Sequence, residues 1–300
     1  MRVLVAGGTG VLGAPTVRRL LEAGHDVTLL ARPEHRATPA GVRVEIVDLC
    51  DGEAVREAVE RVRPEAVVVH VSSLPEKIDS RTMAAAFRQN SRIRTAAGVH
   101  LARAAAGIGA RTVFSGAAFW YARGAGLAEE SVPFWFDAPE PILRTIWSLV
   151  EAETAVDLAH GVILRLGILL GPGTHHDRAG YIGKQIVAGT LPILGDGTGV
   201  TSFVHVEDVA TATLRALGIA PGAYNVVDDE PAAARDWMPV FAAAYGGPPP
   251  KRLPEAAARL VFNHALAEWI LTNRGASNAK LRATGWQPAF ASWRATLSAS

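Results

Sequence analysis

The chain has 300 residues and a formal net charge of +1 at neutral pH, with 30 lysines and arginines against 29 aspartates and glutamates. A charge so close to zero argues against binding to nucleic acid or to a membrane surface through bulk electrostatics. Hydrophobic residues make up 49% of the chain, enough to bury the core of one large globular domain or of two closely associated ones.

Cys50 is the single cysteine, which excludes an internal disulfide framework and is typical of a reducing compartment. Met1 leads straight into an apolar run with no signal-peptide pattern. The longest apolar stretch, residues 161–171, contains Arg165 and is too short to span a bilayer. We therefore expect a cytoplasmic protein, and the alanine- and arginine-rich composition is typical of a GC-rich bacterial genome.

Short runs of β-branched residues alternate with longer amphipathic stretches, a pattern typical of βαβ units in a parallel sheet. The pattern predicts strands at residues 3–6, 26–31, 43–47, 66–71, 111–115 and 161–166. It predicts helices at residues 15–23, 53–61, 81–106 and 144–160. The last two helices are long enough to line a subunit interface, which makes a homodimer a reasonable expectation.

A glycine-rich stretch at residues 7–13, Gly-Gly-Thr-Gly-Val-Leu-Gly, directly follows the apolar run at residues 3–6. This order predicts a strand that turns through glycines into a helix. Glycine lets the backbone turn tightly and approach a ligand, and the start of the helix offers unpaired N–H groups and its positive dipole end to phosphates. The stretch predicts a site for a dinucleotide pyrophosphate, although a purely structural glycine turn has the same local pattern.

Further motifs follow in a fixed order along the chain. They lie at residues 67–70 (Val-Val-Val-His), 165–173 (Arg-Leu-Gly-Ile-Leu-Leu-Gly-Pro-Gly), 195–197 (Gly-Asp-Gly), 202–210 (Ser-Phe-Val-His-Val-Glu-Asp-Val-Ala), 224–226 (Tyr-Asn-Val) and 285–288 (Gly-Trp-Gln-Pro). Each is weak alone, but the set in this order resembles the extended short-chain dehydrogenase/reductase family, also called the NAD-dependent epimerase/dehydratase family.

The resemblance implies an α/β fold with a Rossmann-type doubly wound parallel sheet and a smaller C-terminal substrate-binding region. The dinucleotide-binding domain would comprise residues 1–170 and about 201–228, and the substrate-binding region residues 171–200 and 229–300. Much of this second region is rich in glycine, proline and tryptophan, as expected of loops and short elements that form a pocket for a small molecule.

The end of the second strand indicates which nicotinamide cofactor binds. An acidic residue there would hydrogen-bond the ribose of NAD, whereas an arginine would pair with the 2′-phosphate of NADP. Arg32 stands there with Arg36 close by, so we expect NADP, with NAD as second choice and a merely solvated Arg32 as the alternative. The resemblance also implies that Asp48 and Leu49 lie against the adenine. The predicted cofactor-binding residues are Gly7, Thr9, Gly10, Val11, Leu12, Gly13, Arg32, Arg36, Asp48, Leu49, Val71 and Ser72.

The reductive chemistry of the family uses a tyrosine that moves a proton and a lysine four residues later that lowers the pKa of the tyrosine. This pair is missing from the chain. The four tyrosines, at positions 121, 181, 224 and 245, are followed four residues later by Ala125, Gln185, Asp228 and Pro249. Where the family places the pair, in residues 141–151 ahead of a helix glutamate, apolar side chains replace both members.

The hydroxyl that the family places near the end of the fifth strand is displaced as well. Two alignments of residues 113–121 (Val-Phe-Ser-Gly-Ala-Ala-Phe-Trp-Tyr) with the family motif put Gly116 or Ala117 at its position, and Ser115 lies beside it. The chain is therefore expected to be an atypical member of the family, whose usual catalytic mechanism does not carry over.

In a first interpretation the chain is an oxidoreductase, reductase or epimerase-like, with a non-standard proton donor and a hydrophobic small molecule of bacterial specialised metabolism as substrate. Hydride transfer requires only an electrophilic carbon facing C4 of the nicotinamide and something that stabilises the developing charge. The candidate catalytic residues are Tyr121, Ser115 and Lys184, with Tyr181 and Lys77 as further candidates. For each of them a surface or packing role is the alternative.

In a second interpretation the pocket performs a dehydration, cyclisation or rearrangement, with a base supplied by residues 175–177 (His-His-Asp). Adjacent side chains diverge, so these residues are not expected to bind a metal. In a third, the chain binds the cofactor without catalysis, as a sensor or auxiliary protein. The hydrophobic substrate is expected from a set of aromatic residues: Phe119, Trp120, Phe134, Trp135, Phe136 and Trp147.

Several other polar residues are expected to be structural. His70 and His205 resemble family histidines that mostly support strand ends and loops. Asn90 resembles the family's helix asparagine, which is structural or holds water. Arg165 lies late in a predicted buried strand and is expected to pair with an acid such as Asp208, or else to orient the substrate.

Overall fold

The computed structural model describes residues 1–32, 41–75, 77, 83–262 and 264–298. Within this part of the chain, the central sheet has seven strands, all paired in parallel, in the order β11-β6-β5-β4-β1-β2-β3. The strands are β1 (Arg2–Ala6), β2 (Asp26–Ala31), β3 (Arg43–Ile46), β4 (Ala66–Val69), β5 (Arg111–Ala117), β6 (Val162–Leu166) and β11 (Gly222–Val226). The strand order reverses between β1 and β4, so a crevice for a ligand is expected at their carboxyl ends.

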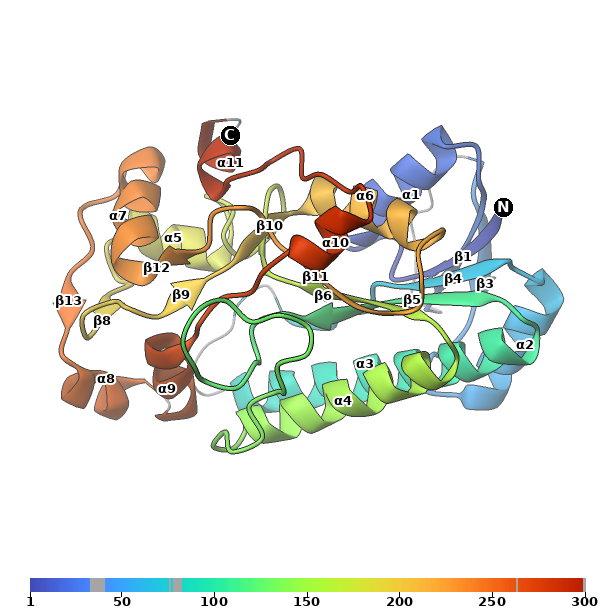
Figure 1. Cartoon of the computed structure of the whole chain (residues 1–300), viewed down its shortest axis with the longest axis horizontal. Helices are drawn as coiled ribbons and strands as arrows, with labels where there is room; N and C mark the ends of the chain where they lie inside the picture. Colours follow the sequence, from blue (N-terminus) through green and yellow to red (C-terminus); the bar gives the residue numbers. More distant parts are fainter. Residues whose placement is uncertain (33–40, 76, 78–82, 263, 299–300) are drawn as a thin grey trace.

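Helices cover both faces of this sheet (Figure 1). One face packs against α1 (Gly13–Glu22) and α6 (Val206–Ala216), and the other against α2 (Gly52–Val62), α3 (Met83–Gly107) and α4 (Ile142–Leu158). The strands β1 and β4 are almost wholly buried because both of their faces are covered. The predicted α/β doubly wound fold is confirmed.

The six predicted strands and four predicted helices are all present, with ends displaced by at most two residues. The seventh strand, β11, was not predicted as a strand. It is an edge strand whose first two residues are only half-buried, so its sequence lacks the continuous apolar run of the central strands.

The remaining elements, apart from α10, which packs beside β11, form a smaller region at one end of the sheet, on the left of Figure 1. Its core contains Phe203, Trp237, Phe241 and Trp293, whose rings lie 5.2–6.3 Å apart between centroids in the pairs that touch. The remaining elements are α5 (Tyr181–Val187), α7 (Ala234–Tyr245), α8 (Glu255–Val261), α9 (His264–Thr272), α10 (Ala279–Ala283), α11 (Trp293–Ser298), β7 (Ile168–Leu170), β8 (Ile193–Leu194), β9 (Val200–Thr201), β10 (Phe203–His205), β12 (Ala232–Ala233) and β13 (Arg252–Leu253).

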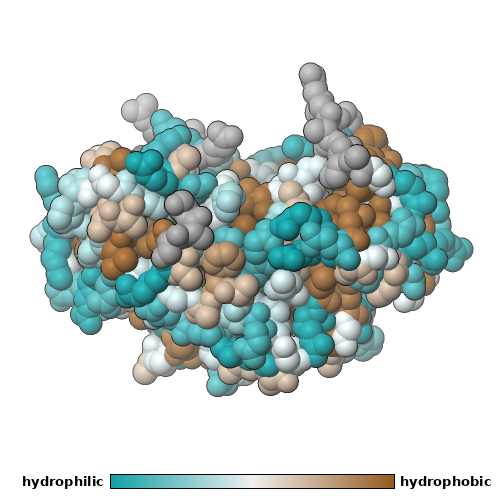
Figure 2. All heavy atoms as spheres, turned by 90° about the horizontal axis from the view of Figure 1, so that it is seen from above, coloured by the Kyte–Doolittle hydropathy of each residue, from teal (hydrophilic) through white to brown (hydrophobic). Residues whose placement is uncertain are grey.

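The helix α7 is longer than the loops and short elements expected in this region, even though it contains Pro239. Proline removes one helix hydrogen bond, and the burial of Trp237, Met238 and Phe241 on one side offsets that loss. Figure 2 shows the molecule from above, with hydrophobic patches separated by hydrophilic ones. Among the described residues, none of the helices is both long enough and apolar enough to cross a membrane.

Candidate functional site

The turn between β1 and α1 can be built only with glycine at two positions. Gly7 has φ of 80°, and a Cβ on it would lie 2.5 Å from the carbonyl oxygen of His70. A Cβ on Gly13 would lie 2.0 Å from the carbonyl oxygen of Gly7. Both distances are shorter than any real contact, so the tight turn and the close crossing of strand and helix each require glycine.

The first turn of α1 is open to solvent. Thr9, Gly10 and Val11 are exposed, and no side chain caps the helix at Leu12. A Cβ on Gly10 would fill space that holds only the carbonyl oxygen of Gly7, at 3.4 Å. The start of α1 therefore offers N–H groups and a positive dipole end to an anion, as the pyrophosphate of a dinucleotide requires.

The predicted adenosine residues lie at the ends of β2 and β3. Arg32 is exposed directly after β2, whereas Arg36 lies outside the described residues. Asp48 is exposed, and its Oδ1 accepts a hydrogen bond from the backbone N–H of Cys50 at 2.9 Å, while Leu49 is buried in the core. Arg32 and Asp48 thus follow the carboxyl ends of β2 and β3, at the same edge of the sheet at which β1 leads into the glycine-rich turn.

The loop after β4 is held by a side chain from α3. The Oδ1 of Asn90 accepts hydrogen bonds from the backbone N–H of Ser73 at 2.8 Å and from the hydroxyl of Ser72 at 3.2 Å. Val71 is half-buried in this loop, and Lys77 is exposed further along it. Asn90 thus fixes the loop that carries the predicted cofactor residues Val71 and Ser72.

The hydroxyl of Ser115 is hydrogen-bonded to His70, on the face of the sheet covered by α1 and α6. Ser115 Oγ lies 2.6 Å from His70 Nδ1, and His70 Nε2 lies 3.2 Å from the hydroxyls of both Thr16 and Thr213. Both threonine hydroxyls donate to backbone carbonyls at 2.8 Å, so Nε2 must carry the imidazole proton and Ser115 must donate to Nδ1. Burial lowers the pKa of His70 to about 4.

Tyr121 lies in a buried network between the loop after β5 and the strands β6 and β11. Its hydroxyl donates to Oδ1 of Asn225 at 2.7 Å and accepts from Nη1 of Arg165 at 3.0 Å. Its ring stacks on that of Phe134, with the centroids 5.6 Å apart. Burial raises the pKa of Tyr121 to about 12, so the proton is held tightly at neutral pH.

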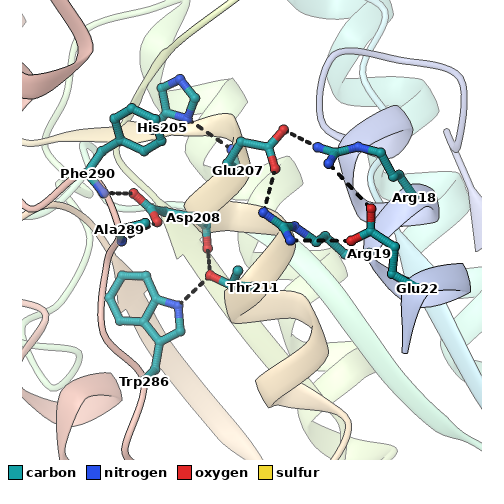
Figure 3. Close-up of polar contacts among 10 residues, drawn as sticks. All are labelled: Arg18, Arg19, Glu22, His205, Glu207, Asp208, Thr211, Trp286, Ala289 and Phe290. Atoms are coloured by element: carbon teal, nitrogen blue, oxygen red, sulfur yellow. Dashed lines mark hydrogen bonds and ion pairs between the residues drawn. The ribbon is translucent and has the colours of Figure 1, made fainter. Parts of the chain in front are cut away.

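Arg165 pairs with Glu153 of α4, and not with Asp208 as the sequence led us to expect. Its Nη2 donates to Oε2 of Glu153 at 2.7 Å and its Nε to the same oxygen at 3.1 Å. Asp208 instead accepts the backbone N–H groups of Ala289 and Phe290 at 2.7 and 3.0 Å (Figure 3). The sequence could not separate Glu153 from Glu151, because only the rotation of α4 decides which glutamate faces the sheet.

The predicted catalytic residues do not meet. Lys184 is exposed on α5, and no hydrogen bond or ion pair within the described residues joins it to Tyr121 or Ser115. The carboxylate of Asp177 accepts from the backbone N–H groups of Gly173 and Ala179, while the ring of His176 contacts those of Phe203 and Trp237. The described part of the chain contains no group of three or more His, Cys, Asp or Glu side chains that could hold a metal ion.

A cavity that the sequence did not predict lies between α3 and α4, next to the end of β5. It is small and partly open to solvent, with room of about 20 Å³ for a water-sized molecule, and Trp120, Asn90 and Arg94 line it. The residues of α4 that line it are Thr145, Ser148, Leu149 and Ala152. No tyrosine or lysine of α4 therefore faces this cavity, in agreement with the missing Tyr-x-x-x-Lys pair.

Comparison with known proteins gives the family. Residues 3–226 match the model of the NAD dependent epimerase/dehydratase family. A protein of a Streptomyces species named 3-diazoavenalumate denitrifying reductase is 41% identical over 302 residues, covering 98% of each chain. The 2-alkyl-3-oxoalkanoate reductase of Stenotrophomonas maltophilia is 29% identical over 263 residues, covering 83% of this chain and 77% of that protein.

The fold agrees with solved structures of the same family. The UDP-glucose 4-epimerase of Thermus thermophilus, solved in complex with NAD, has a TM-score of 0.71 and 26% sequence identity, covering 96% of this chain and 94% of that one. The family model covers the N-terminal three quarters of the chain. The glycine-rich turn and the strand order of the central sheet lie within that part and are those of a dinucleotide-binding domain. The chain therefore belongs to the NAD-dependent epimerase/dehydratase family of extended short-chain dehydrogenases/reductases.

Proposed function

We propose that the chain is an NADPH-dependent reductase that transfers hydride to an acceptor whose reduction requires no proton donor, and that this acceptor is a carboxylate with a carbon-bound diazo group. The observation that carries the proposal is the set of side chains of α4 at the cavity. Thr145 and Ser148 donate their hydroxyl protons to the backbone carbonyls of Pro141 and Arg144 at 3.3 and 3.0 Å, and Leu149 is apolar.

Two predicted catalytic hydroxyls outside α4, those of Ser115 and Tyr121, are also engaged. Ser115 gives its proton to His70 and Tyr121 gives its proton to Asn225. A ketone reductase must protonate the alkoxide that hydride transfer forms, which is why it needs a positioned acid. A reaction that forms no alkoxide is free of that requirement.

Loss of a diazo group meets this condition. Bound NADPH would supply the hydride. When the diazo group is in its diazonium form, C–N₂⁺, the hydride forms a new C–H bond and the electron pair of the broken C–N bond leaves with N₂, so the reduction takes up no further proton. The Streptomyces relative at 41% identity is named for a diazo substrate and for its denitrification, which supports this class of substrate.

The test uses the purified protein with NADPH doubly deuterated at C4 of the nicotinamide and with 3-diazoavenalumate, the compound named for the relative. We expect oxidation of NADPH, release of one N₂ per NADPH, and one deuterium on the product carbon that carried the diazo group. Consumption of the diazo compound without deuterium in the product would contradict hydride transfer.

The preference for NADPH rests on Arg32, which is exposed directly after β2, and the described residues 29–32 at that strand end include no acidic residue. We expect Arg32→Glu to weaken binding of NADPH at least tenfold and to change binding of NADH little, since a lost ion pair with a phosphate affects only the phosphorylated cofactor. Isothermal titration calorimetry measures both affinities, with Arg103→Glu, an exposed site on α3, as the matched control. Equal losses for the two cofactors would contradict the phosphate role.

A second candidate function is reduction of a ketone with a recruited acid such as Lys184 or Tyr181. The match to a 2-alkyl-3-oxoalkanoate reductase favours it. Turnover of a 2-alkyl-3-oxoalkanoate, lost in Lys184→Met or Tyr181→Phe, would support this candidate. Binding of NADPH with turnover of neither substrate would favour the non-redox or non-catalytic alternatives.

A further inference from the structure

Arg94 brings a half-buried positive charge to the cavity between α3 and α4. Its Nη2 donates to the carbonyl oxygen of Ser115 at 2.5 Å, and its guanidinium lies 5.9 Å from the centre of the Phe114 ring. Burial lowers the pKa of Arg94, and the charge of Glu153 opposes this effect. Arginine nevertheless stays protonated in proteins, so the side chain carries its charge into the interior.

The carboxylate nearest to this charge is already occupied. Both oxygens of Glu153 accept hydrogen bonds from Arg165, at 2.7–3.3 Å. Within the described residues, no carboxylate lies within 4.0 Å of the guanidinium of Arg94. Charges taken out of water are normally paired, and the charge that acts on Arg94 is that of Glu153, which Arg165 already binds directly.

Three hydroxyl groups around the cavity, those of Thr95, Thr145 and Ser148, already donate to backbone carbonyls. Thr95 donates to the carbonyl oxygen of Ser148 at 2.8 Å, and the hydroxyls of Thr145 and Ser148 donate to the carbonyls one turn earlier in α4. The remaining hydrogen-bond donors for a ligand in the cavity therefore lie on α3.

Asn90 adds a second donor beside Arg94. Its Oδ1 accepts a hydrogen bond from the backbone N–H of Ser73. This bond fixes the orientation of the amide, so that the oxygen lies toward Ser73 and the NH₂ group lies on the opposite side. In the part of the chain that the structure describes, the hydrogen bonds of Asn90 all use the oxygen. Asn90 and Arg94 are four residues apart on α3 and so lie on the same face of the helix, and both line the cavity.

We propose that Arg94 and Asn90 bind the carboxylate of the substrate at the side of this cavity that is open to solvent, with Trp120 against the adjoining hydrocarbon part of the substrate. This inference rests on the proposed function for the choice of a carboxylate substrate. A guanidinium and an amide NH₂ on one helix face match the two oxygens of a carboxylate, and Trp120 is held against Trp269 and Phe119 with ring centroids 5.4 and 5.0 Å apart. Arg94 thereby becomes a specificity-determining residue that selects acids over their esters.

The experiment compares avenalumate, which lacks the diazo group and cannot react, with its methyl ester. Dissociation constants are measured in the presence of NADP⁺ by quenching of tryptophan fluorescence, to which Trp120 at the cavity contributes. We expect the wild-type protein to prefer the acid. Arg94→Met should weaken binding of the acid roughly 10- to 100-fold, the range of a hydrogen bond to a charged group, and leave binding of the ester unchanged. Arg94→Lys should retain part of the preference.

Arg92→Met is the matched control, because Arg92 is exposed two residues away on the same helix and faces elsewhere. Its affinities for acid and ester should equal those of the wild type. Equal weakening of acid and ester by Arg94→Met, or no binding of the acid to the wild-type protein, would overturn the proposal.

A second variant keeps the test valid if Arg94→Met does not fold. Asn90→Asp preserves the acceptor for the N–H of Ser73 but replaces the NH₂ donor with a second oxygen and a negative charge, so it should weaken binding of the acid more than that of the ester. An unchanged ratio would speak against the carboxylate site. Because binding is measured without turnover, the result is independent of whether 3-diazoavenalumate is reduced.

Discussion

His70 illustrates how burial decides the chemistry of a single side chain. It is 5% exposed, its ring hydrogen-bonds only to hydroxyl groups among the described residues, and burial lowers its pKa to about 4 from an ordinary value of 6.5. Between these pH values the unfolded state binds a proton that the folded state does not, so the free energy of unfolding falls as the pH drops from 6.5 toward 4 and is unaffected above 6.5.

We expect His70 to account for a loss of roughly 2 kcal/mol of stability between pH 7 and pH 4.5. Urea denaturation at the two pH values measures it. His70→Gln, which does not titrate, should be less stable than the wild type at pH 7 but should lose correspondingly less on acidification. His264→Gln, at an exposed position, is the control. A variant whose loss on acidification equals that of the wild type would refute this assignment.

Substitution of Tyr121 tests whether its buried hydroxyl contributes to catalysis or to the stability of the fold. Tyr121→Phe would remove a donor to Asn225 and an acceptor for Arg165, and leaving buried polar groups unpaired costs about 1–3 kcal/mol. We therefore expect lower stability in denaturant titrations with kcat largely retained. A collapse of kcat at unchanged stability would identify Tyr121 as the proton donor after all.

The residues of the site differ in how far the sequence could reveal them. The glycines at positions 7 and 13 follow a local pattern with a local steric cause, so they could be identified directly. Arg94 carries no such signal, because an arginine on an amphipathic helix is usually exposed. Its burial depends on the packing of α3 against α4 over β5.

At the scale of elements, α2 shows a helix whose start is encoded locally. The carboxylate of Asp51 accepts the backbone N–H groups of Glu53 and Ala54, both at 3.1 Å. We expect Asp51→Ala to lower the free energy of unfolding by about 1 kcal/mol, and Asp51→Ser to lower it less, since serine also caps helices well. Denaturant titration measures both, and Glu57→Ala at an exposed site of the same helix should have little effect. Equal effects of alanine and serine would contradict capping.

At the scale of the whole molecule, α6 ties the C-terminal segment to the central domain. Asp208 accepts two backbone N–H groups of that segment, and Trp286 donates to the hydroxyl of Thr211 at 3.1 Å (Figure 3). On its other side, Glu207 pairs with Arg18 and Arg19 of α1. The segment therefore depends on a buried carboxylate for its position.

Asp208→Asn should loosen this segment, because an amide has one accepting oxygen and cannot bind both N–H groups. We expect faster hydrogen exchange at Ala289 and Phe290, measured by mass spectrometry, while exchange in β1 and β4 stays slow. Asp236→Asn, at an exposed ion pair, is the control. Unchanged exchange at the two amides would show that other contacts hold the segment.

The homodimer expected through α3 and α4 stays a prediction. Trp147 and Leu158 of α4 are 55% and 78% exposed, and Phe136 packs against Trp147 with ring centroids 4.9 Å apart. These apolar side chains are the place where a second copy of the chain would bind.

The sequence by itself determined the features with local causes. Alternating apolar runs specified six of the seven described strands of the central sheet and the helices between them, glycine sterics specified the phosphate turn, and a direct search established that Tyr-x-x-x-Lys is absent. Only the tertiary structure decided which polar groups are already paired. The rotation of α4 places Glu153 against Arg165. The packing of α1 and α6 on the sheet places His70 within hydrogen-bond distance of Ser115. The packing of α3 against α4 places Arg94 in the wall of the cavity. Each of these outcomes depends on groups distant in sequence coming into contact, and no local pattern encodes such contacts.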